Sequence, residues 1–335
     1  GTNWKKNIPY GGSSGILFAT QLPAATAFGG ITVCGDLLLV PVTDDENAEN
    51  GGIYALDRAT GAIRWFYRTG YSVRNRVAVD ERNVYAVDSR GDIHAATLAD
   101  GSRVWLNRAD RTLLNISSAG ALVADGKVFA GNGALFRAVD CASGKTLWNN
   151  TGWTERTASC DFPQQYGELV LTTSYLNGLC AHDRTTGELK WRNYVNWNFP
   201  FASAGIDGDT IYLKREKELF QIDGKTGRTL GRTQTAANLA TASAPVAAGE
   251  LIVFGSRTKG LLAFHKKDLS PAWNVAVGPA LLASAYYAEP SEQTVESTPL
   301  LCGERLYFGA NDGRLREVEC SSGRVLRSWY AGSPI

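Results

Sequence analysis

The chain has 335 residues, and its basic and acidic side chains nearly balance, 34 against 33, which leaves a net charge of +1. Binding to nucleic acid or to an anionic membrane surface usually requires a basic excess, so this balance argues against both. No apolar run in the sequence reaches the roughly 18–20 residues that a membrane-spanning helix needs. We therefore expect no nucleic-acid partner and no membrane span.

Residues 1–26 are expected to form an N-terminal linker and strand. Residues 11–15 are Gly- and Ser-rich, which is typical of a flexible link, and residues 16–22 can form a strand that covers the edge of a sheet. The chain begins with Gly and contains no Met. This favours a processed or excised piece of a longer product.

The stretch 51–65 contains the pattern around which the rest of the chain is organised. Ile53 and Ala55 mark one predicted strand, and Trp65 marks a second. Between them, Asp57 can accept backbone hydrogen bonds and Gly61 can adopt a positive φ, so residues 57–61 read as a turn. The stretch therefore predicts a β-hairpin.

The same turn recurs six more times. Successive turns end 40–43 residues apart, except for a last interval of 54 residues. Upstream of the turns lie further apolar runs separated by Asp-Gly, Gly-Asp or Gly-Glu pairs, which are hairpin signals. A repeat of this length with four short strands has the size of one propeller blade. The seven turns are residues 57–61, 97–101, 140–144, 183–187, 223–227, 265–269 and 319–323.

A Trp follows the turn by four residues in five of the repeats. Repeats five and seven carry Gly231 and Arg327 instead, and the turn of repeat six is degenerate and ends at Leu269. One large ring at a fixed place in each blade can fill the layer between neighbouring sheets. We predict an all-β chain that folds, over residues 27–335, as a seven-bladed β-propeller of four-stranded antiparallel blades. The five residues are Trp65, Trp105, Trp148, Trp191 and Trp273.

The run Gly-x-Leu/Ile-x-Ala-x-Asp-x-x-Thr-Gly-x-x-x-Trp is similar to the repeat of quinoprotein-type propellers, the PQQ-like repeat. Residues 52–65 and 178–191 match it best, and the resemblance covers about residues 28–331. It implies that each Trp docks between adjacent blades. The dehydrogenases of that family also carry two adjacent Cys residues beside the quinone and a calcium-binding Glu/Asn/Asp set. Neither can be placed among the six Cys and the acidic residues here, so we expect no cofactor and no metal.

Two acidic motifs raise the question of a metal site. The link 44–49 could bind calcium, but it lacks the EF-hand spacing, and a solvated loop is favoured. Asp92 and His94 have the Asp-x-His spacing of phosphoesterase metal sites. They align, however, with Gly52 and Tyr54 of the first repeat, which makes them part of an ordinary third strand.

A looser resemblance concerns the links between repeats. Residues 65–68 followed by Arg74, and Trp153 before repeat four, resemble the C-terminal propellers of bacterial exported calcineurin-like metallophosphoesterases. This implies a non-catalytic module for ligand or protein binding within a larger exported protein, periplasmic or cell-surface. Its partner would be an upstream catalytic domain of the same polypeptide, or a protein or glycan ligand. The alternatives are an outer-membrane-assembly-type scaffold propeller and a quinoprotein dehydrogenase.

The predicted binding surface is the face on which fourth-to-first and second-to-third strand links meet. Arg and aromatic residues on such links are typical of recognition surfaces, although loops are polar in any protein and Trp153 and Trp197 could pack on blade rims. Basic links enter repeats two to four, and we expect the acidic link 44–49 to lie on the opposite side. No catalytic residue is assigned. The binding candidates are Arg74, Arg76, Arg156, Trp153, Trp197, Tyr286 and Tyr287.

Overall fold

The computed structural model consists almost entirely of β-strands over the residues that it describes. In these ranges the only helical element is a 3-10 turn at Ala48–Asn50, and no helix there is long and apolar enough to cross a membrane. The described residues are 18–26, 30–44, 46–109, 119–132, 135–150, 162–174, 178–194, 203–281 and 292–331.

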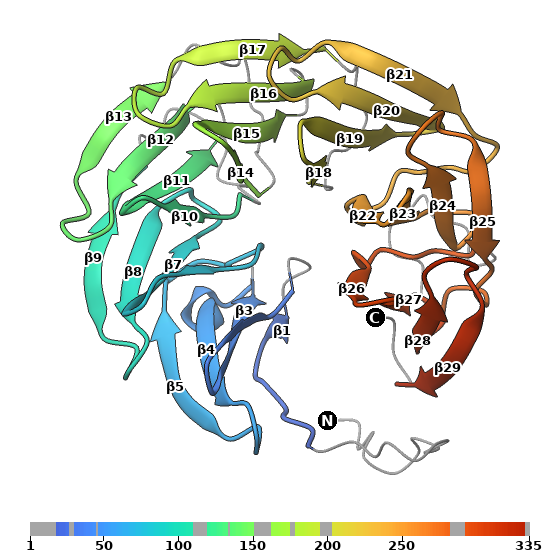
Figure 1. Cartoon of the computed structure of the whole chain (residues 1–335). Coiled ribbons are helices and arrows are strands. Elements are labelled where there is room, and N and C mark those ends of the chain that lie inside the picture. The colour runs from blue at the N-terminus through green and yellow to red at the C-terminus, as the bar shows by residue number, and fades with distance from the viewer. Residues whose placement is uncertain are drawn as a thin grey trace. The chain divides into compact units, whose positions relative to one another are not determined.

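The strands form seven antiparallel sheets, each made from consecutive strands of the chain (Figure 1). This arrangement confirms the predicted seven-bladed β-propeller of four-stranded blades. The chain divides into two compact units, residues 16–196 with blades one to four, and residues 197–335 together with residues 1–15, with blades five to seven. The two units are described separately below.

Blades one to four make up the first unit. Blade one has a fifth strand, because β1 pairs with β3 beside β2. The strands are β1 (Ala25–Thr26), β2 (Thr32–Cys34), β3 (Leu37–Thr43), β4 (Gly52–Asp57), β5 (Ile63–Arg68), β6 (Ala78–Val79), β7 (Asn83–Val87), β8 (Ile93–Thr97), β9 (Arg103–Asn107), β10 (Leu122–Ala124), β11 (Lys127–Asn132), β12 (Leu135–Asp140), β13 (Thr146–Asn150), β14 (Gln164–Tyr166), β15 (Leu169–Ser174), β16 (Gly178–Asp183) and β17 (Leu189–Asn193).

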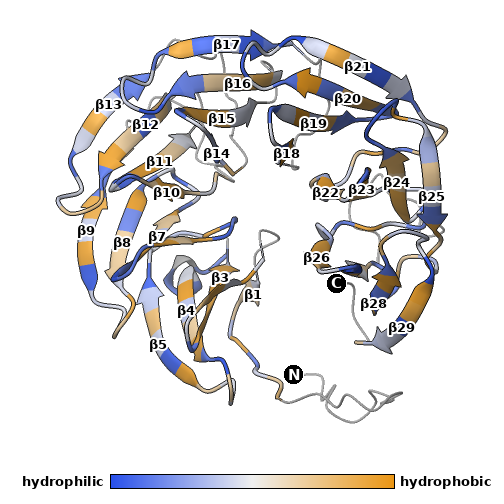
Figure 2. Cartoon of the chain, in the orientation of Figure 1, coloured by the Kyte–Doolittle hydropathy of each residue, from blue (hydrophilic) through white to orange (hydrophobic). Residues whose placement is uncertain are grey.

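Blades five to seven make up the described part of the second unit. Their strands are β18 (Gly205–Asp207), β19 (Thr210–Arg215), β20 (Glu218–Asp223), β21 (Thr229–Gln234), β22 (Val246–Ala248), β23 (Leu251–Gly255), β24 (Leu261–His265), β25 (Pro271–Val275), β26 (Leu300–Cys302), β27 (Arg305–Ala310), β28 (Arg314–Glu319) and β29 (Val325–Tyr330). Figure 2 shows hydrophobic and hydrophilic residues side by side along many strands. Inner strands such as β23 are buried along their whole length, whereas outer strands such as β21 alternate between exposed and half-buried residues.

The turn between third and fourth strands is built as the sequence predicts. In blade one, Asp57 Oδ1 accepts hydrogen bonds from the backbone N–H groups of Ala59, at 3.0 Å, and Thr60, at 2.8 Å, while Gly61 has φ +72°. The guanidinium of Arg64, followed by Thr60, holds the pKa of Asp57 well below its usual range. A carboxylate that is ionised at neutral pH can accept all these hydrogen bonds, which fixes the turn.

Each of four described Trp residues closes an interface with the next blade. We call the arrangement the tryptophan lock: the ring covers the turn Gly of the next blade, and the indole N–H donates to the carbonyl of the second turn residue. A Cβ added to Gly101 would come within 2.7 Å of the Trp65 ring, so only Gly fits beneath it. The indole bonds are Trp65 to Leu98 (3.0 Å), Trp105 to Cys141 (2.8 Å), Trp148 to Arg184 (3.3 Å) and Trp273 to Cys320 (3.1 Å).

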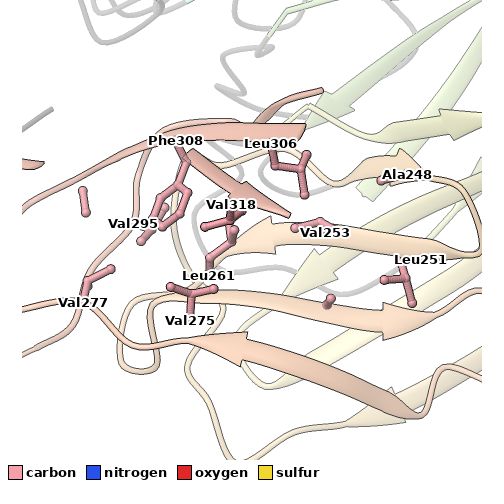
Figure 3. Close-up of a cluster of buried hydrophobic side chains, with 12 residues drawn as sticks. Ala248, Leu251, Val253, Leu261, Val275, Val277, Val295, Leu306, Phe308 and Val318 are labelled. Atoms are coloured by element: carbon pink, nitrogen blue, oxygen red, sulfur yellow. The ribbon is translucent and has the colours of Figure 1, made fainter. Parts of the chain in front are cut away.

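Behind the locks, apolar side chains fill the layer between sheets. Figure 3 shows the cluster between blades six and seven, where Val253 and Leu261 of blade six lie near Leu306 and Val318 of blade seven. All four are fully buried. At roughly 1.5–3 kcal/mol for each buried aliphatic side chain, such clusters contribute much of the stability of an interface.

The N-terminal strand differs from the prediction. β1 is Ala25–Thr26, whereas the described part of the predicted strand, residues 18–22, has no strand pairing. Phe18 and Thr20 instead contact Gly61 through their side chains. Side-chain contacts therefore hold the beginning of the segment, and its backbone pairs with the edge of β3 only at Ala25–Thr26.

Candidate functional site

Three links of the first unit meet at Ser72, which is buried. The Asp44 N–H donates to Ser72 Oγ at 3.0 Å, and the Ser89 N–H donates to the Ser72 carbonyl at 2.7 Å. The Val73 N–H donates to the carbonyl of Val42 at 3.1 Å. These bonds join link 69–77 to links 44–51 and 88–92, so side chains from all three share one face.

Two guanidinium groups on this face lie against aromatic rings. The Arg90 guanidinium carbon is 4.6 Å from the centre of the Tyr71 ring, and Arg90 also donates a hydrogen bond to the Tyr71 hydroxyl. The Arg76 guanidinium carbon is 3.6 Å from the centre of the Phe162 ring. Cation–π contacts of this kind hold a guanidinium in a defined plane. Together with Arg74, which lies on the same link as Arg76, these residues form what we call the arginine–aromatic cluster: Tyr71, Arg74, Arg76, Arg90 and Phe162.

A buried polar network fixes the loop that carries Arg90. Asp88 Oδ1 accepts the backbone N–H groups of Arg90, at 2.9 Å, and Asp92, at 3.0 Å. Asp88 Oδ2 lies 3.1 Å from His94 Nε2, and His94 Nδ1 lies 3.0 Å from the Tyr67 hydroxyl. Burial raises the pKa of Tyr67 to about 12, so this hydroxyl keeps its proton. The two ring nitrogens of His94 thus join Tyr67 to Asp88 through one hydrogen bond on each side.

Asp92 and His94 do not act as a pair. Asp92 Oδ1 accepts the N–H of Ala109 at 2.8 Å, and Arg137 nearby donates to the carbonyl of Gly91 at 2.8 Å. Burial lowers the pKa of Arg137 to about 10, with Asp92 and Asp88 acting in the opposite direction. Within the described ranges, no three His, Cys, Asp or Glu side chains gather in a way that could hold a metal ion.

The acidic link folds around its own first residue. Asp44 Oδ1 accepts the backbone N–H groups of Glu46, at 3.1 Å, and Asn47, at 2.8 Å, and Oδ2 accepts Asn50 Nδ2 at 2.8 Å. The Asn50 side chain, followed by the Asn47 N–H, lowers the pKa of Asp44. This link adjoins the basic link through Ser72, so the predicted separation of acidic and basic links is wrong here. The reason is connectivity, since the chain leaves β5 across the same end of the blade as link 44–51.

The structure places two of the seven predicted residues. Arg74 is half-buried and Arg76 exposed, both on link 69–77. Sequence reasoning missed Phe162, which lies 72 positions beyond Arg90, the nearest other member of the cluster in the chain. No motif in the sequence marks Phe162; the structure shows its ring against Gly120, where an added Cβ would come within 2.6 Å of it. The other predicted residues lie outside the described residues: Arg156, Trp153, Trp197, Tyr286 and Tyr287.

A second polar network holds the links of the second unit. Lys214 Nζ donates to the carbonyls of Leu239 and Thr241, both at 2.7 Å, and to Thr241 Oγ1 at 2.8 Å. Burial lowers the pKa of Lys214 to about 7, and Glu296 opposes this shift. Three acceptors require three protons, so this geometry suits the ammonium form. The amine is therefore used to hold link 235–245 and is poorly placed to act as a nucleophile.

Two carboxylates complete this second network. Glu296 Oε2 accepts the N–H of Ala242 at 2.7 Å, and burial raises the pKa of Glu296. Glu292 Oε2 pairs with Arg257 Nε at 2.7 Å, with both side chains largely buried. The pair and the Lys214 contacts join links 235–245, 256–260 and 292–299. We interpret these charges as structural, since each named contact ties one link to another.

The four-stranded blades, the Asp-to-Gly turns and the tryptophan locks define the class of protein, a PQQ-like β-propeller. The chain matches the PQQ_2 family model, described as "Outer membrane protein assembly factor BamB", over residues 20–170, 124–238 and 177–329. These segments cover most of the sequence, and the chain belongs to this family.

Relatives and solved structures agree with this family. The outer membrane protein assembly factor BamB of Moranella endobia is 22% identical over 312 residues, which are 90% of this chain and 74% of the relative. The crystal structure of BamB from Moraxella catarrhalis matches 94% of this chain and 89% of its own, with a TM-score of 0.66 and 18% identity. The quinohemoprotein alcohol dehydrogenase from Comamonas testosteroni matches 93% of this chain and 68% of its own, with a TM-score of 0.70 and 14% identity. At such identities the two structures show a shared fold.

Proposed function

We propose that this chain is a non-catalytic scaffold propeller that binds protein partners in the assembly of outer membrane proteins. The observation that carries the proposal is the match to the assembly-factor family along most of the chain, with a relative of that name aligned over 90% of it. This role implies export to the periplasm. It was the alternative reading of the sequence, and the family match now favours it over the metallophosphoesterase module.

The arginine–aromatic cluster is the surface on which we place the partner. Arg and aromatic side chains dominate the energetics of many protein interfaces, and a side chain already held in place loses less entropy on binding. Arg76 against Phe162 and Arg90 against Tyr71 are held in this way. We propose that acidic segments of the partner contact Arg74, Arg76 and Arg156 near Trp153, because planar guanidinium groups bind carboxylates through two hydrogen bonds.

The buried titratable groups support a binding role. Asp88, His94 and Tyr67 hold the loop of Arg90, and Lys214 holds link 235–245. A rigid face presented by fixed links suits recognition. The quinoprotein dehydrogenase reading rests on a likeness of fold, and the sequence has no adjacent Cys pair. An upstream catalytic domain and a glycan ligand stay predictions, because none of the relatives named above bears on them.

A photo-crosslinking experiment in intact cells tests the proposal. A crosslinking amino acid at Arg76 is expected to capture a protein of the outer-membrane assembly machinery, whereas the same amino acid at Val104, exposed on β9, is the matched control. In the protein without the crosslinking amino acid, replacing Arg74 and Arg76 by Ala should weaken binding of the captured partner and reduce the salt dependence of that binding. Equal capture at both positions, or an unchanged salt dependence, would contradict the placement of the site.

A separate titration tests the absence of enzyme activity. Adding pyrroloquinoline quinone and calcium to the purified chain should leave the absorbance of the quinone unchanged. A stoichiometric change accompanied by oxidation of alcohols or sugars would overturn the proposed function in favour of a dehydrogenase.

A further inference from the structure

The flank of blade one is covered by the chain's own N-terminal segment, residues 18–26. The Phe18 ring lies against Gly61, at the place where an added Cβ would point, and Thr20 Oγ1 donates to the Gly61 carbonyl at 2.6 Å. Gly61 closes the turn of blade one and has φ +72°. The first two anchors of the segment therefore converge on one turn residue.

Phe18 occupies the place that Trp occupies in the tryptophan lock. In blades two and three, Gly101 and Gly144 of the same turn are covered by Trp65 and Trp105. The sequence spacing agrees with the contact. Phe18 precedes the first residue of β2 by 14 residues, close to the 13 residues by which Trp65 precedes β6. By contact and by spacing, Phe18 is a lock residue.

The rest of the segment is bound in an extended form. Leu22 and Ala24 pack against the buried cluster that includes Val40, Val42 and Tyr54. Phe18, Thr20, Leu22 and Ala24 alternate along the chain, which is the spacing by which an extended peptide turns every second side chain to one surface. The Tyr54 and Phe66 rings stack with their centres 4.3 Å apart and belong to that surface.

A two-residue ladder completes the contact. Ala25 pairs with Thr43 and Thr26 pairs with Val42, on the part of β3 that lies beyond its pairing with β2. In blade seven, a side chain satisfies the corresponding edge of the second strand. Ser297 Oγ accepts the Gly309 N–H and donates to the Gly309 carbonyl. The edge of β3 is thus satisfied by added backbone, as in peptide binding by strand addition.

We propose that the flank of blade one is a binding site for an extended peptide anchored by an aromatic ring, and that residues 18–26 are the ligand that the chain supplies to itself. The recognised pattern is an aromatic residue, a Thr two positions on, apolar residues at the next two alternate positions, and then two residues that pair with β3. The site is separate from the arginine–aromatic cluster, and the proposal does not depend on the proposed function. Any protein segment with this pattern competes for the same surface.

Substitutions of Phe18 in the whole chain test the lock. Phe18→Ala should release the segment, increase hydrogen exchange within β1 at least tenfold and expose residues 18–26 to proteolysis. Phe18→Trp should keep the protection, because Trp is the residue found in the other locks. Val104→Ala, on the exposed surface of β9, is the control and should change neither measurement. Unchanged exchange and proteolysis in Phe18→Ala would overturn the proposal.

A peptide of residues 18–26 tests the site itself. A labelled peptide should bind the Phe18→Ala chain and be excluded by the wild-type chain, and a peptide with Phe18→Ala should bind neither. A peptide with Thr20→Val, which lacks only the hydroxyl of Thr20, should bind the released chain more weakly. In the whole chain, Thr20→Val serves as the released variant if Phe18→Ala fails to fold. Failure of the wild-type peptide to bind the released chain would overturn the proposal. Exchange of the segment between isotopically labelled and unlabelled copies, with dimer formation, would assign the site to a second copy and overturn self-binding.

Discussion

The interface between blades two and three and the interface between blades five and six solve the same packing problem with different residues. Between blades two and three, Trp105 covers Gly144 and donates its indole N–H to the carbonyl of Cys141. Between blades five and six, Gly231 stands at the Trp position and Leu269 at the turn Gly position. Leu269 is buried, and its Cδ1 lies 3.7 Å from where a Cβ of Gly231 would be. The side chain that fills this interface therefore comes from the turn of blade six instead of the fourth strand of blade five.

The hydrogen bond of the lock has also been replaced. Ala95 faces Trp105 across the β8–β9 ladder, whereas Gln221 faces Gly231 across the β20–β21 ladder. Gln221 Nε2 donates to the carbonyl of Lys266 at 3.3 Å, and Lys266 is the second turn residue, as Cys141 is in blade three. The side-chain amide of Gln221, on β20, therefore replaces the indole N–H as the donor to the turn carbonyl.

The exchange has a backbone cost. Leu269 has φ +57°, in the left-handed region that costs a residue other than Gly roughly 1–2 kcal/mol. Burial of its side chain, about 2% exposed, contributes a similar or larger amount. The comparison shows that the positions of Gln221, Gly231 and Leu269 form one interface unit. A residue at one of them fits only when the other two are matched to it.

Removing the ring from a tryptophan lock should have the largest effect. Trp148 lies near Phe129 and Phe136, with ring centres 6.0 and 5.5 Å away. Trp148→Ala should lower the free energy of unfolding by about 3–5 kcal/mol, because it removes a large packed ring and the hydrogen bond to Arg184. Denaturant midpoints measure this. Leu147→Ala, an exposed neighbour on β13, should stay within about 0.5 kcal/mol; similar losses for both would mean that the ring is not a lock.

Acid should weaken the interface between blades three and four. Burial lowers the pKa of His182 from 6.5 to about 4, and its ring lies 4.8 Å from the ring of Phe136. Between these pH values the unfolded chain binds a proton that the folded chain does not. Stability should therefore be lost as the pH falls from 6.5 to 4, by about 3 kcal/mol. The difference between wild type and His182→Gln across pH measures this. His265→Gln, on the exposed turn of blade six, should keep the wild-type slope.

Rebuilding a tryptophan lock between blades five and six tests the idea of a unit. Gly231→Trp alone should cost about 1–3 kcal/mol, since the new ring meets Leu269. Adding Leu269→Gly and Gln221→Ala should restore stability to within about 1 kcal/mol of wild type, a coupling that neighbouring residues commonly show. Strictly additive losses in thermal or denaturant unfolding would show that the three positions are independent.

The smallest expected effect concerns the substitute hydrogen bond. Gln221→Leu should cost about 1 kcal/mol, because it keeps the volume and removes the donor to the Lys266 carbonyl. Lys225→Ala, on the exposed turn of blade five, is a control near zero. No loss in Gln221→Leu beside a clear loss in Gln221→Ala would assign the effect to packing instead.

The fold could be predicted from the sequence because its signals are local and repeated. The Asp57-to-Gly61 turn and the Trp four residues later carry their meaning within a few residues. Gly231 and Leu269, by contrast, read as two unrelated losses. They lie 38 positions apart, and only their contact shows that one compensates for the other. Phe18 was likewise hidden, because its partner Gly61 lies in a distant turn.

The candidate site was harder to predict, since it depends on which links meet. Position on link 69–77 could place Arg74 and Arg76, but the aromatic partner of Arg76 comes from residues before β14. The role of His94 also depends on its partner. The repeat pattern correctly predicted that His94 belongs to an ordinary third strand and forms no metal-site pair with Asp92, but it gave no sign that the partner would be Asp88.

The turn at Gly61 and its counterparts bear on how such a chain grows by gene duplication. A repeat with a Trp on its fourth strand and a Gly in its turn can form the tryptophan lock with both neighbours, since its Trp covers the next turn and its Gly accepts the preceding Trp. A copy of it can therefore be inserted beside another repeat of the same kind. Repeats five and six do not share this freedom. A copy of repeat five placed before a Gly-bearing turn would leave the joint hollow, because neither Gly231 nor that Gly fills it. These two repeats can be copied only as a pair, and their boundary should be inherited intact.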